Sequence, residues 1–344
     1  MIKSGIENLF PGYFAMVMAT GIVAIACFFE GLQTLAYALS TLNVAVYAVL
    51  VVLLSIRIVG YPKRVAADAL DHVRGPGFFT VPAGSCVLGS QLLILHGLSA
   101  AAVVLWFVGM LSWAIVTYTF FAAVTTKEEK PTISQGLSGT WLLAAVATQS
   151  VSVLGTLLAP HFPARSELIL FFTLSMFLIG CMLYLMLIIL IFYRFTFVDL
   201  TSERLTPPYW INMGAVAIAT LAGSRLILAA GSSRIITDLT PFLKGFTMFF
   251  WASGTWWIPL LLLLGLWRHV YMRYPLRYDP QYWGLVFPLG MYTVCTIQLS
   301  KAVEFEPLMI IPSVFIYFAL AAWLAAAVGF VWAWIPKRPQ NQPI

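Results

Sequence analysis

The chain of 344 residues is 61% hydrophobic and only 9% charged, with a net charge of +6 and a mean hydropathy of +0.92. Soluble domains carry roughly 25% charged residues and leave much of their surface in water. The composition therefore excludes a soluble fold and predicts an integral membrane protein, whose positive charge need not imply a nucleic-acid partner.

Ten stretches of the sequence are long and apolar enough to cross a bilayer, for which a helix needs about 20 residues. In chain order we predict helices over residues 10–30, 36–57, 77–96, 99–124, 137–159, 168–193, 209–231, 245–268, 282–300 and 308–334. The first is too long for the apolar region of a signal peptide, so we expect it to remain in the protein. The sequence thus predicts one all-α transmembrane domain over residues 1–344.

The basic residues predict the orientation, because cytoplasmic loops of membrane proteins are enriched in Lys and Arg. An even number of spans puts both termini on one side. The opposite side holds only Arg165, Arg225, Arg234, Lys244 and Lys301. We therefore expect both termini in the cytoplasm, on the side that carries Lys3, Arg57, Lys63, Arg64, Arg74, Lys127, Lys130, Arg194, Arg204, Arg268, Arg273, Arg277, Lys337 and Arg338.

Odd-numbered and even-numbered spans differ in composition. The even spans are dominated by Leu, Ile, Val and Phe, whereas the odd spans are richer in small residues and start with an aromatic anchor. The anchors Phe14, Phe79, Trp141, Trp210 and Trp283 are separated by 65, 62, 69 and 73 residues, each about one helical hairpin. This spacing predicts five hairpins whose odd helices surround a central pore. Aromatic anchoring at the membrane interface is the alternative explanation.

Residues four, seven and eleven positions after each anchor share one helix face, which we interpret as the pore face. This face is small and neutral except at Phe287, which we predict to be a gate that closes a narrow pore by sterics or dewetting. Small residues also mediate helix packing, and the spacing leaves that alternative open. The candidate pore-lining residues are Met18, Gly21, Ala83, Cys86, Ala145, Thr148, Gly214, Ala217, Gly290 and Val294.

Two prolines predict helix kinks beside this face. Pro288 follows Phe287 directly, and Pro82 lies near the equivalent level of the third span. Proline removes a backbone hydrogen bond and clashes with the preceding turn. Bent backbone is tolerated in a membrane where it faces a cavity or other helices.

No acidic or basic residue lies deep in any predicted span, whereas proton-coupled transporters usually carry an intramembrane acid or histidine. The pattern favours a pore for small anions over a pump. Arg225 and Lys301, near span ends, are candidate vestibule cations, although ordinary topology or lipid-headgroup contact also explains them. Within the pore we expect peptide dipoles and side-chain hydroxyls to supply the field, the hydroxyls being those of Thr20, Thr148, Ser152, Thr220 and Thr293.

Motifs of soluble catalysis are absent: there is no HExxH, GxSxG or Walker loop. The four cysteines lie singly in apolar runs, so neither a metal site nor a cofactor is expected. We predict that the chain is not an enzyme. A membrane-embedded transferase and a scaffold without transport are the alternatives.

Three segments resemble one known family. Residues Phe10–Gly21 (FPGYFAMVMATG) resemble the first helix of the tellurite-resistance/dicarboxylate transporter family, which also contains plant slow-type anion channels, fungal malate permeases and sulfite efflux pumps. Gly139–Leu143 with Val146–Ser150 is similar to the fifth helix of that family, and Trp283–Tyr292 is similar to the ninth. The resemblance extends over essentially all ten helices.

The resemblance implies five hairpins around a central pore, a homotrimer with one pore per subunit, and occlusion of the pore by Phe287. It implies a short bacterial form in the cytoplasmic (inner) membrane. The fifth and seventh helices lack the interior prolines of more kinked members, which leaves the pore width open. The function predicted is an anion channel or permease for small inorganic or organic anions. The alternative is a coupled C4-dicarboxylate (malate) transporter or a sulfite- or tellurite-type oxyanion exporter.

Overall fold

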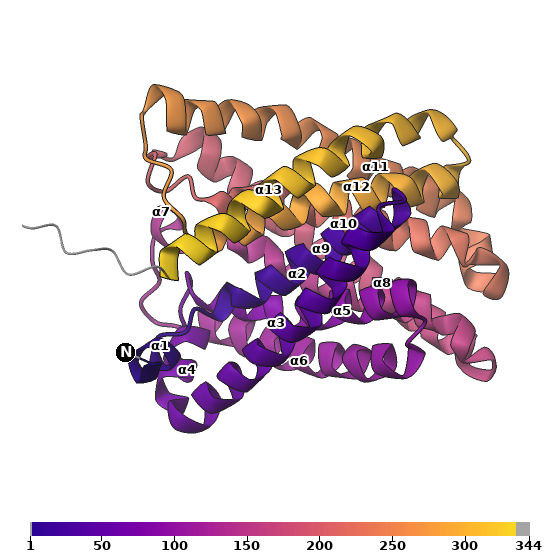
Figure 1. Cartoon of the computed structure of the whole chain (residues 1–344), viewed down its shortest axis with the longest axis horizontal. Helices are drawn as coiled ribbons and strands as arrows, with labels where there is room; N and C mark the ends of the chain where they lie inside the picture. Colours follow the sequence, from indigo (N-terminus) through magenta and orange to yellow (C-terminus); the bar gives the residue numbers. More distant parts are fainter. Residues whose placement is uncertain (1, 335–344) are drawn as a thin grey trace, which may run out of the picture.

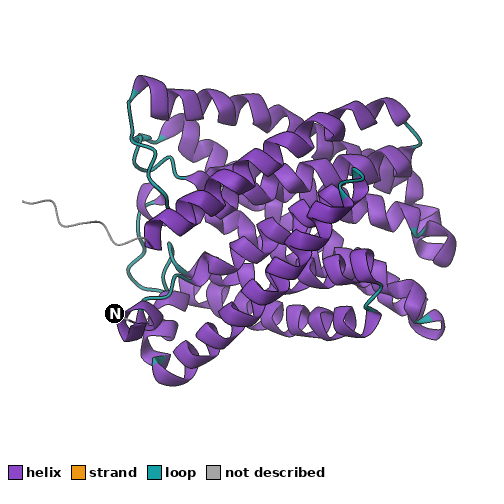
Figure 2. Cartoon of the chain, in the orientation of Figure 1, coloured by secondary structure: helices purple, strands orange, loops and turns teal. Residues whose placement is uncertain are grey.

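The structure is a computed structural model that describes residues 2–334. All regular secondary structure in this range is helical, as Figure 2 shows, which confirms the all-α prediction. Figure 1 shows α1 (Ile2–Glu7) and the last turn of α13 (Ile310–Trp334) at the same end of the bundle. Lys337 and Arg338, which contributed to the predicted orientation, lie outside the described residues.

Five inner helices form a closed ring. They are α2 (Ala15–Phe29), α5 (Thr80–His96), α8 (Leu143–Leu158), α10 (Ile211–Leu228) and α12 (Trp283–Val303). Each packs against the next in this order, and α12 packs against α2. Their small residues permit this close approach, since small side chains let the backbones of membrane helices come together.

Five outer helices surround this ring. They are α3 (Gln33–Gly60), α6 (Ser99–Thr126), α9 (Ser166–Phe197), α11 (Arg234–Leu266) and α13, and each packs against the inner helix that precedes it in sequence. The outer helices bury only 17–44% of their most apolar window inside the protein, whereas α2, α5, α8 and α10 bury 78–94%. Large aliphatic and aromatic side chains therefore face outward, as expected for helices whose solvent is lipid.

Nine helices of the described chain are long and apolar enough to span a membrane. Helix α12 has the length of a span, with 21 residues, but it is not among the nine, because tyrosine, threonine and glutamine side chains lower its apolar character. It is nevertheless buried along nearly its whole length in the ring. These nine helices identify the chain as a multi-pass membrane protein.

A 3₁₀ turn leads into every inner helix: η1 (Pro11–Phe14), η2 (Gly75–Phe79), η3 (Gly139–Leu142), η6 (Pro207–Trp210) and η9 (Pro280–Tyr282). Four of these turns carry proline in their first two positions, where its missing N–H costs nothing. The third lacks proline, and its cap Ser138 accepts a hydrogen bond from the Thr140 amide at 3.4 Å. The five turns contact one another in a second closed ring.

The helix predicted over residues 245–268 begins instead at Arg234. The prediction stopped at Lys244 because a charged residue marks the edge of an apolar stretch. In the structure, Ser233 caps the helix by accepting a hydrogen bond from the Ile236 amide, and Asp238 lies on an exposed face. The helix therefore extends beyond its apolar segment. Short helices α4 (Pro62–Ala69) and α7 (Ile133–Gly136) add structure that the sequence reading did not include.

Candidate functional site

Two cavities lie inside the ring of inner helices. Residues of all five inner helices line the first cavity. Each helix contributes three residues at positions i, i+3 and i+7, a spacing that keeps them on one helix face. These triplets are Ile22–Ile25–Phe29, Val87–Ser90–Ile94, Ser150–Val153–Leu157, Ile218–Leu221–Arg225 and Met291–Val294–Gln298.

The second cavity lies at the end where the inner helices begin. Here the 3₁₀ turns and the first helical turns contribute residues at i and i+3: Gly12 and Ala15, Gly77 and Thr80, Thr140 and Leu143, Pro208 and Ile211, and Gln281 and Gly284. The later residue of each pair lies seven positions before the first residue of the corresponding triplet. One continuous stripe on each inner helix therefore lines both cavities.

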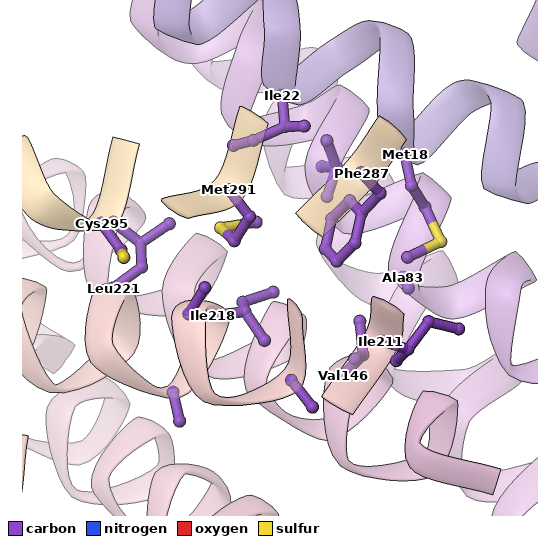
Figure 3. Packing of buried hydrophobic residues seen from close by; sticks show 14 of the residues in the cluster. Met18, Ile22, Ala83, Val146, Ile211, Ile218, Leu221, Phe287, Met291 and Cys295 are labelled. Atoms are coloured by element: carbon purple, nitrogen blue, oxygen red, sulfur yellow. The ribbon is translucent and has the colours of Figure 1, made fainter. Parts of the chain in front are cut away.

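One further level of these stripes lies between the pairs of the second cavity and the triplets of the first. Three positions beyond the second-cavity pairs, the five stripes reach Met18, Ala83, Val146, Gly214 and Phe287. Phe287 is the only aromatic residue of this set and is 1% exposed. Figure 3 shows its ring extending from α12 toward Met18 and Ala83. The set matches the predicted level four residues past each anchor in every helix but α8, where Val146 takes the place of Ala145.

The difference in α8 comes from its anchor. The 3₁₀ turn of this repeat ends at Leu142 rather than at Trp141. The Trp141 indole instead donates hydrogen bonds to the carbonyls of His72 and Gly136, both at 2.9 Å. As a result the stripe in α8 is shifted by one residue. Thr148 then points away from it, and its hydroxyl accepts a hydrogen bond from Trp113 of α6 at 2.8 Å.

The remaining predicted pore-lining residues divide into three groups. Cys86 and Val294 line the first cavity. Gly21 and Gly290 lie beside the stripe, where a Cβ would come within 2.8 Å of Asn43 in α3 and 2.9 Å of Ile22 in α2, respectively. Such glycines serve helix packing, the alternative that the spacing left open. Buried residues outside the cavity linings are Ala145 and Ala217.

The two predicted kink prolines have different positions. Pro288 lies inside α12, directly after Phe287, and its ring abuts Gly214, where a Cβ would lie 2.7 Å from Cγ of the proline. Pro82 is the third residue of α5. In the first turn of a helix the missing N–H removes no interior α-helical bond, so Pro82 has no physical reason to kink the helix.

The hydroxyls expected to supply the field make other contacts. Thr20 accepts a hydrogen bond from Trp323 of α13 at 3.1 Å, and Ser152 donates to the Thr173 carbonyl at 2.7 Å. Thr220 and Thr293 donate to carbonyls of their own helices. None of these hydroxyls belongs to the lining of either cavity, where the hydroxyl residues are instead Ser90, Ser150, Thr80 and Thr140.

Arg225 is the one charged residue in the linings of these two cavities within the described chain. It lies in the last turn of α10, and its Nη1 donates a hydrogen bond to Gln298 Oε1 at 3.2 Å. The sequence reading missed Gln298, although an amide inside an apolar span was the available signal. Lys301 is exposed, and its Nζ lies 5.5 Å from the ring centroid of Phe29, which lines the first cavity.

Comparison with known proteins matches residues 8–331 to the family described as voltage-dependent anion channel (SLAC1). The chain is 26% identical over 315 residues to an uncharacterized transporter of Methanocaldococcus jannaschii, covering 89% of both proteins. It is 24% identical over 323 residues to a sulfite efflux pump of Arthroderma otae, covering 86% of this chain and 83% of the pump. An uncharacterized membrane protein of Mycobacterium tuberculosis is 38% identical over 138 residues, 40% of this chain and 70% of that protein.

The chain therefore belongs to the SLAC1 family of anion channels and transporters, because the match covers nearly its whole length. This confirms the resemblance inferred from the three segments.

Proposed function

We propose that this member of the SLAC1 family is a channel or permease that passes small anions through a pore within each subunit. The observation that carries the proposal is the stripe at i, i+3 and i+7 on all five inner helices, which lines two cavities on one axis. No carboxylate contributes to these linings within the described chain, and the single charge is a cation. The cation at one end of this apolar path repels metal cations and attracts anions.

Phe287 is the gate of this proposal. It stands at the constriction among side chains that are mostly smaller, so that removing its ring opens the space between the cavities. Pro288 and Gly214 pack against each other beside it, which supports a fixed position of the ring. A hydrophobic constriction blocks ions by sterics and by exclusion of water.

The test is anion flux into proteoliposomes for Phe287→Ala. We expect flux to rise roughly tenfold or more, since a tenfold change needs a barrier lowered by only about 1.4 kcal/mol. Phe250→Ala is the matched control, because Phe250 is fully buried in α11 among aromatic rings and lines neither cavity. Wild-type flux in Phe287→Ala, or equal increases in both variants, contradicts the gate.

The same proposal includes the membrane topology. Helix α12 is the tenth span, the ten helices form five hairpins, and both termini face the cytoplasm of a bacterium with the protein in its inner membrane. The position of α1 and the last turn of α13 at the same end of the bundle supports an even number of spans. Labelling of a single cysteine introduced at Lys127 or Lys301 with an impermeant reagent tests the orientation, and only the residue-301 variant is expected to react from outside the cell.

The quaternary structure proposed is a homotrimer, with one pore in each subunit. Its support is the family resemblance. Light scattering of the purified protein in detergent measures its mass directly, and crosslinking in membranes gives a second measurement. A monomer in both contradicts the trimer.

A coupled carrier for oxyanions or C4-dicarboxylates is the second candidate. Similarity to sulfite efflux pumps favours the oxyanion form. A dicarboxylate needs two donor clusters about one substrate length apart, whereas the cavity linings offer one, at Arg225 and Gln298. A replacement series of chloride, nitrate, sulfite and malate in proteoliposomes separates these functions, and saturable malate uptake driven by a pH gradient favours the carrier.

A further inference from the structure

The guanidinium of Arg225 has an incomplete set of partners. It forms no ion pair with any described carboxylate, and its Nε is buried without a hydrogen-bond partner. Its surroundings in the first cavity are aliphatic and aromatic side chains such as Leu221 and Phe29. A cation in largely apolar surroundings is stabilised by a counter-charge beside it, so this guanidinium favours the approach of an anion.

Gln298 completes the geometry of the site. Its Oε1 accepts the hydrogen bond from Arg225 Nη1 at 3.2 Å. A guanidinium only donates, so this contact assigns the amide oxygen to the arginine and turns the amide nitrogen away from it. No hydrogen bond in the described chain uses this nitrogen. The pair therefore presents guanidinium and amide N–H donors without acceptors of their own.

The other polar residues of the cavity do not compete for this role. Ser90 donates its hydroxyl proton to the Cys86 carbonyl at 2.9 Å, and Ser150 donates to the Val146 carbonyl at 2.8 Å. Their protons are used within their own helices, which leaves Arg225 and Gln298 as the donors of the lining. Lys301 is exposed nearby, where it raises the local concentration of anions without entering the lining.

We propose that Arg225 and Gln298 form a binding site that selects small oxyanions over halides. The fork of a guanidinium matches two coplanar oxygens, as in nitrate, sulfite, bicarbonate or a carboxylate, and the Gln298 amide adds a third donor. A spherical chloride gains only the charge. The inference rests on the proposed anion path, but it concerns binding at equilibrium, which is measurable without flux.

The test is calorimetric titration of the purified protein with nitrate, sulfite and chloride at constant ionic strength. In the wild type we expect the oxyanions to bind about tenfold more tightly than chloride, the gain from one further charge-assisted hydrogen bond. Arg225→Lys keeps the charge and loses the fork, so the ratio falls toward one. Gln298→Glu keeps the shape and supplies a carboxylate to Arg225, so binding of every anion is lost. Lys301→Gln is the control and leaves the ratio unchanged.

Equal affinity of the wild type for nitrate and chloride overturns the site, as does an unchanged ratio in Arg225→Lys. Because binding of the wild type is informative alone, a variant that fails to fold does not remove the test. Flux in liposomes separates the two proposals. A wild-type protein that binds nitrate but passes no anion refutes the proposed function and keeps the site, whereas selective flux that survives Arg225→Lys refutes the site and keeps the channel.

Discussion

Gly139 lies at the closest approach between two 3₁₀ turns of the ring. A Cβ at this position would come within 2.6 Å of the Pro208 carbonyl carbon and 2.8 Å of Tyr209 Cα. Both neighbours are backbone atoms, so no side-chain rotation relieves the contact. We therefore expect Gly139→Ala to push η3 from η6 and to destabilise the protein by about 1–3 kcal/mol, measured as a lower midpoint of thermal unfolding in detergent.

Gly245→Ala is the matched control for this substitution. Gly245 lies inside α11, and a Cβ there meets nothing within 4 Å. Alanine favours a helix over glycine by up to about 1 kcal/mol, so the control is expected to be neutral or slightly stabilising. Equal midpoints for the two variants contradict the close packing of the turns.

Single residues also show the limit of sequence reading. The anchors Phe14, Phe79 and Trp210, each the second residue of an aromatic pair, are the last residues of their 3₁₀ turns, so aligning the repeats on them gives equivalent levels. In the third repeat the same rule selected Trp141, because Leu142 carries no aromatic signal. The indole of Trp141 forms hydrogen bonds to a neighbouring loop, and a distant partner of this kind leaves no trace in local spacing.

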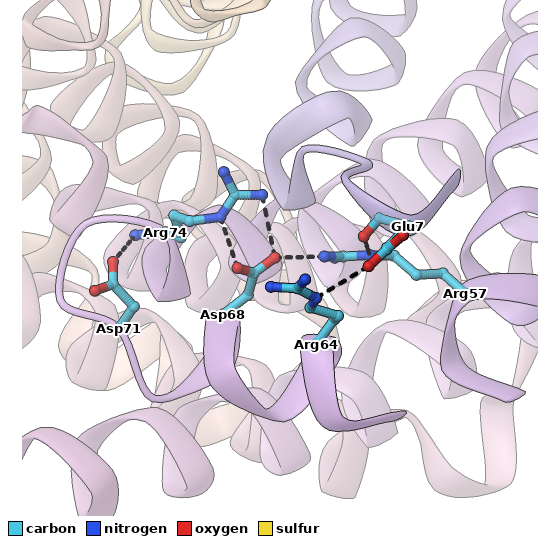
Figure 4. Close-up of polar contacts among 6 residues, drawn as sticks. All are labelled: Glu7, Arg57, Arg64, Asp68, Asp71 and Arg74. Carbon is cyan, nitrogen blue, oxygen red and sulfur yellow. Dashed lines mark hydrogen bonds and ion pairs between the residues drawn. The ribbon is translucent and has the colours of Figure 1, made fainter. Parts of the chain in front are cut away.

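At the scale of elements, a cluster of ion pairs holds α3, α4 and the segment before η2 together (Figure 4). Asp68 of α4 accepts hydrogen bonds from Arg57 at 2.6 Å and from Arg74 at 2.7 Å. Arg57 is 2% exposed and also donates to the Glu7 carbonyl of α1 at 3.1 Å. Because residues of η1 and η2 line the second cavity, this cluster fixes segments that lead directly into that lining.

We expect Asp68→Asn to destabilise the protein by about 3 kcal/mol, because it leaves the buried Arg57 without its counter-charge. Thermal unfolding in detergent measures the loss. Glu7→Gln is the control, since its partner Arg64 is 65% exposed and such a surface pair contributes below about 1 kcal/mol. A loss in Asp68→Asn no larger than in the control shows that the cluster does not hold the elements together.

The division into inner and outer helices was predictable from composition, because small residues and large aliphatic residues alternate between successive spans. The contacts between the two layers were not. Indoles of the outer helices α6, α11 and α13 donate to the hydroxyls of Thr148, Thr296 and Thr20. The sequence analysis assigned the hydroxyls of Thr148 and Thr20 to the pore, since a donor on another helix leaves no signal in the spacing within one helix.

At the scale of the whole molecule, the five inner helices are related by a repeat whose members occupy equivalent levels. The stripe runs at one register through all five helices, from the second cavity to the first. The residue at each level differs between the helices, so that the proposed constriction combines one phenylalanine with smaller side chains. If equivalent positions of the five helices lie at the same level, an aromatic ring on another inner helix can close the proposed pore in place of Phe287.

Val146 of α8 occupies the constriction level that Phe287 occupies in α12. We therefore expect Val146→Phe to restore the closed state in the Phe287→Ala background, returning anion flux in proteoliposomes toward the wild-type value. The comparison variant is Ala145→Phe in the same background, one residue off the stripe and fully buried against other helices. It is expected to leave flux high, provided that gel filtration shows a folded protein. If Ala145→Phe closes the pore and Val146→Phe does not, the register inferred from the aromatic pairs is correct. If neither variant closes it, only α12 can hold the closing ring, because Pro288 and Gly214 pack together beside Phe287.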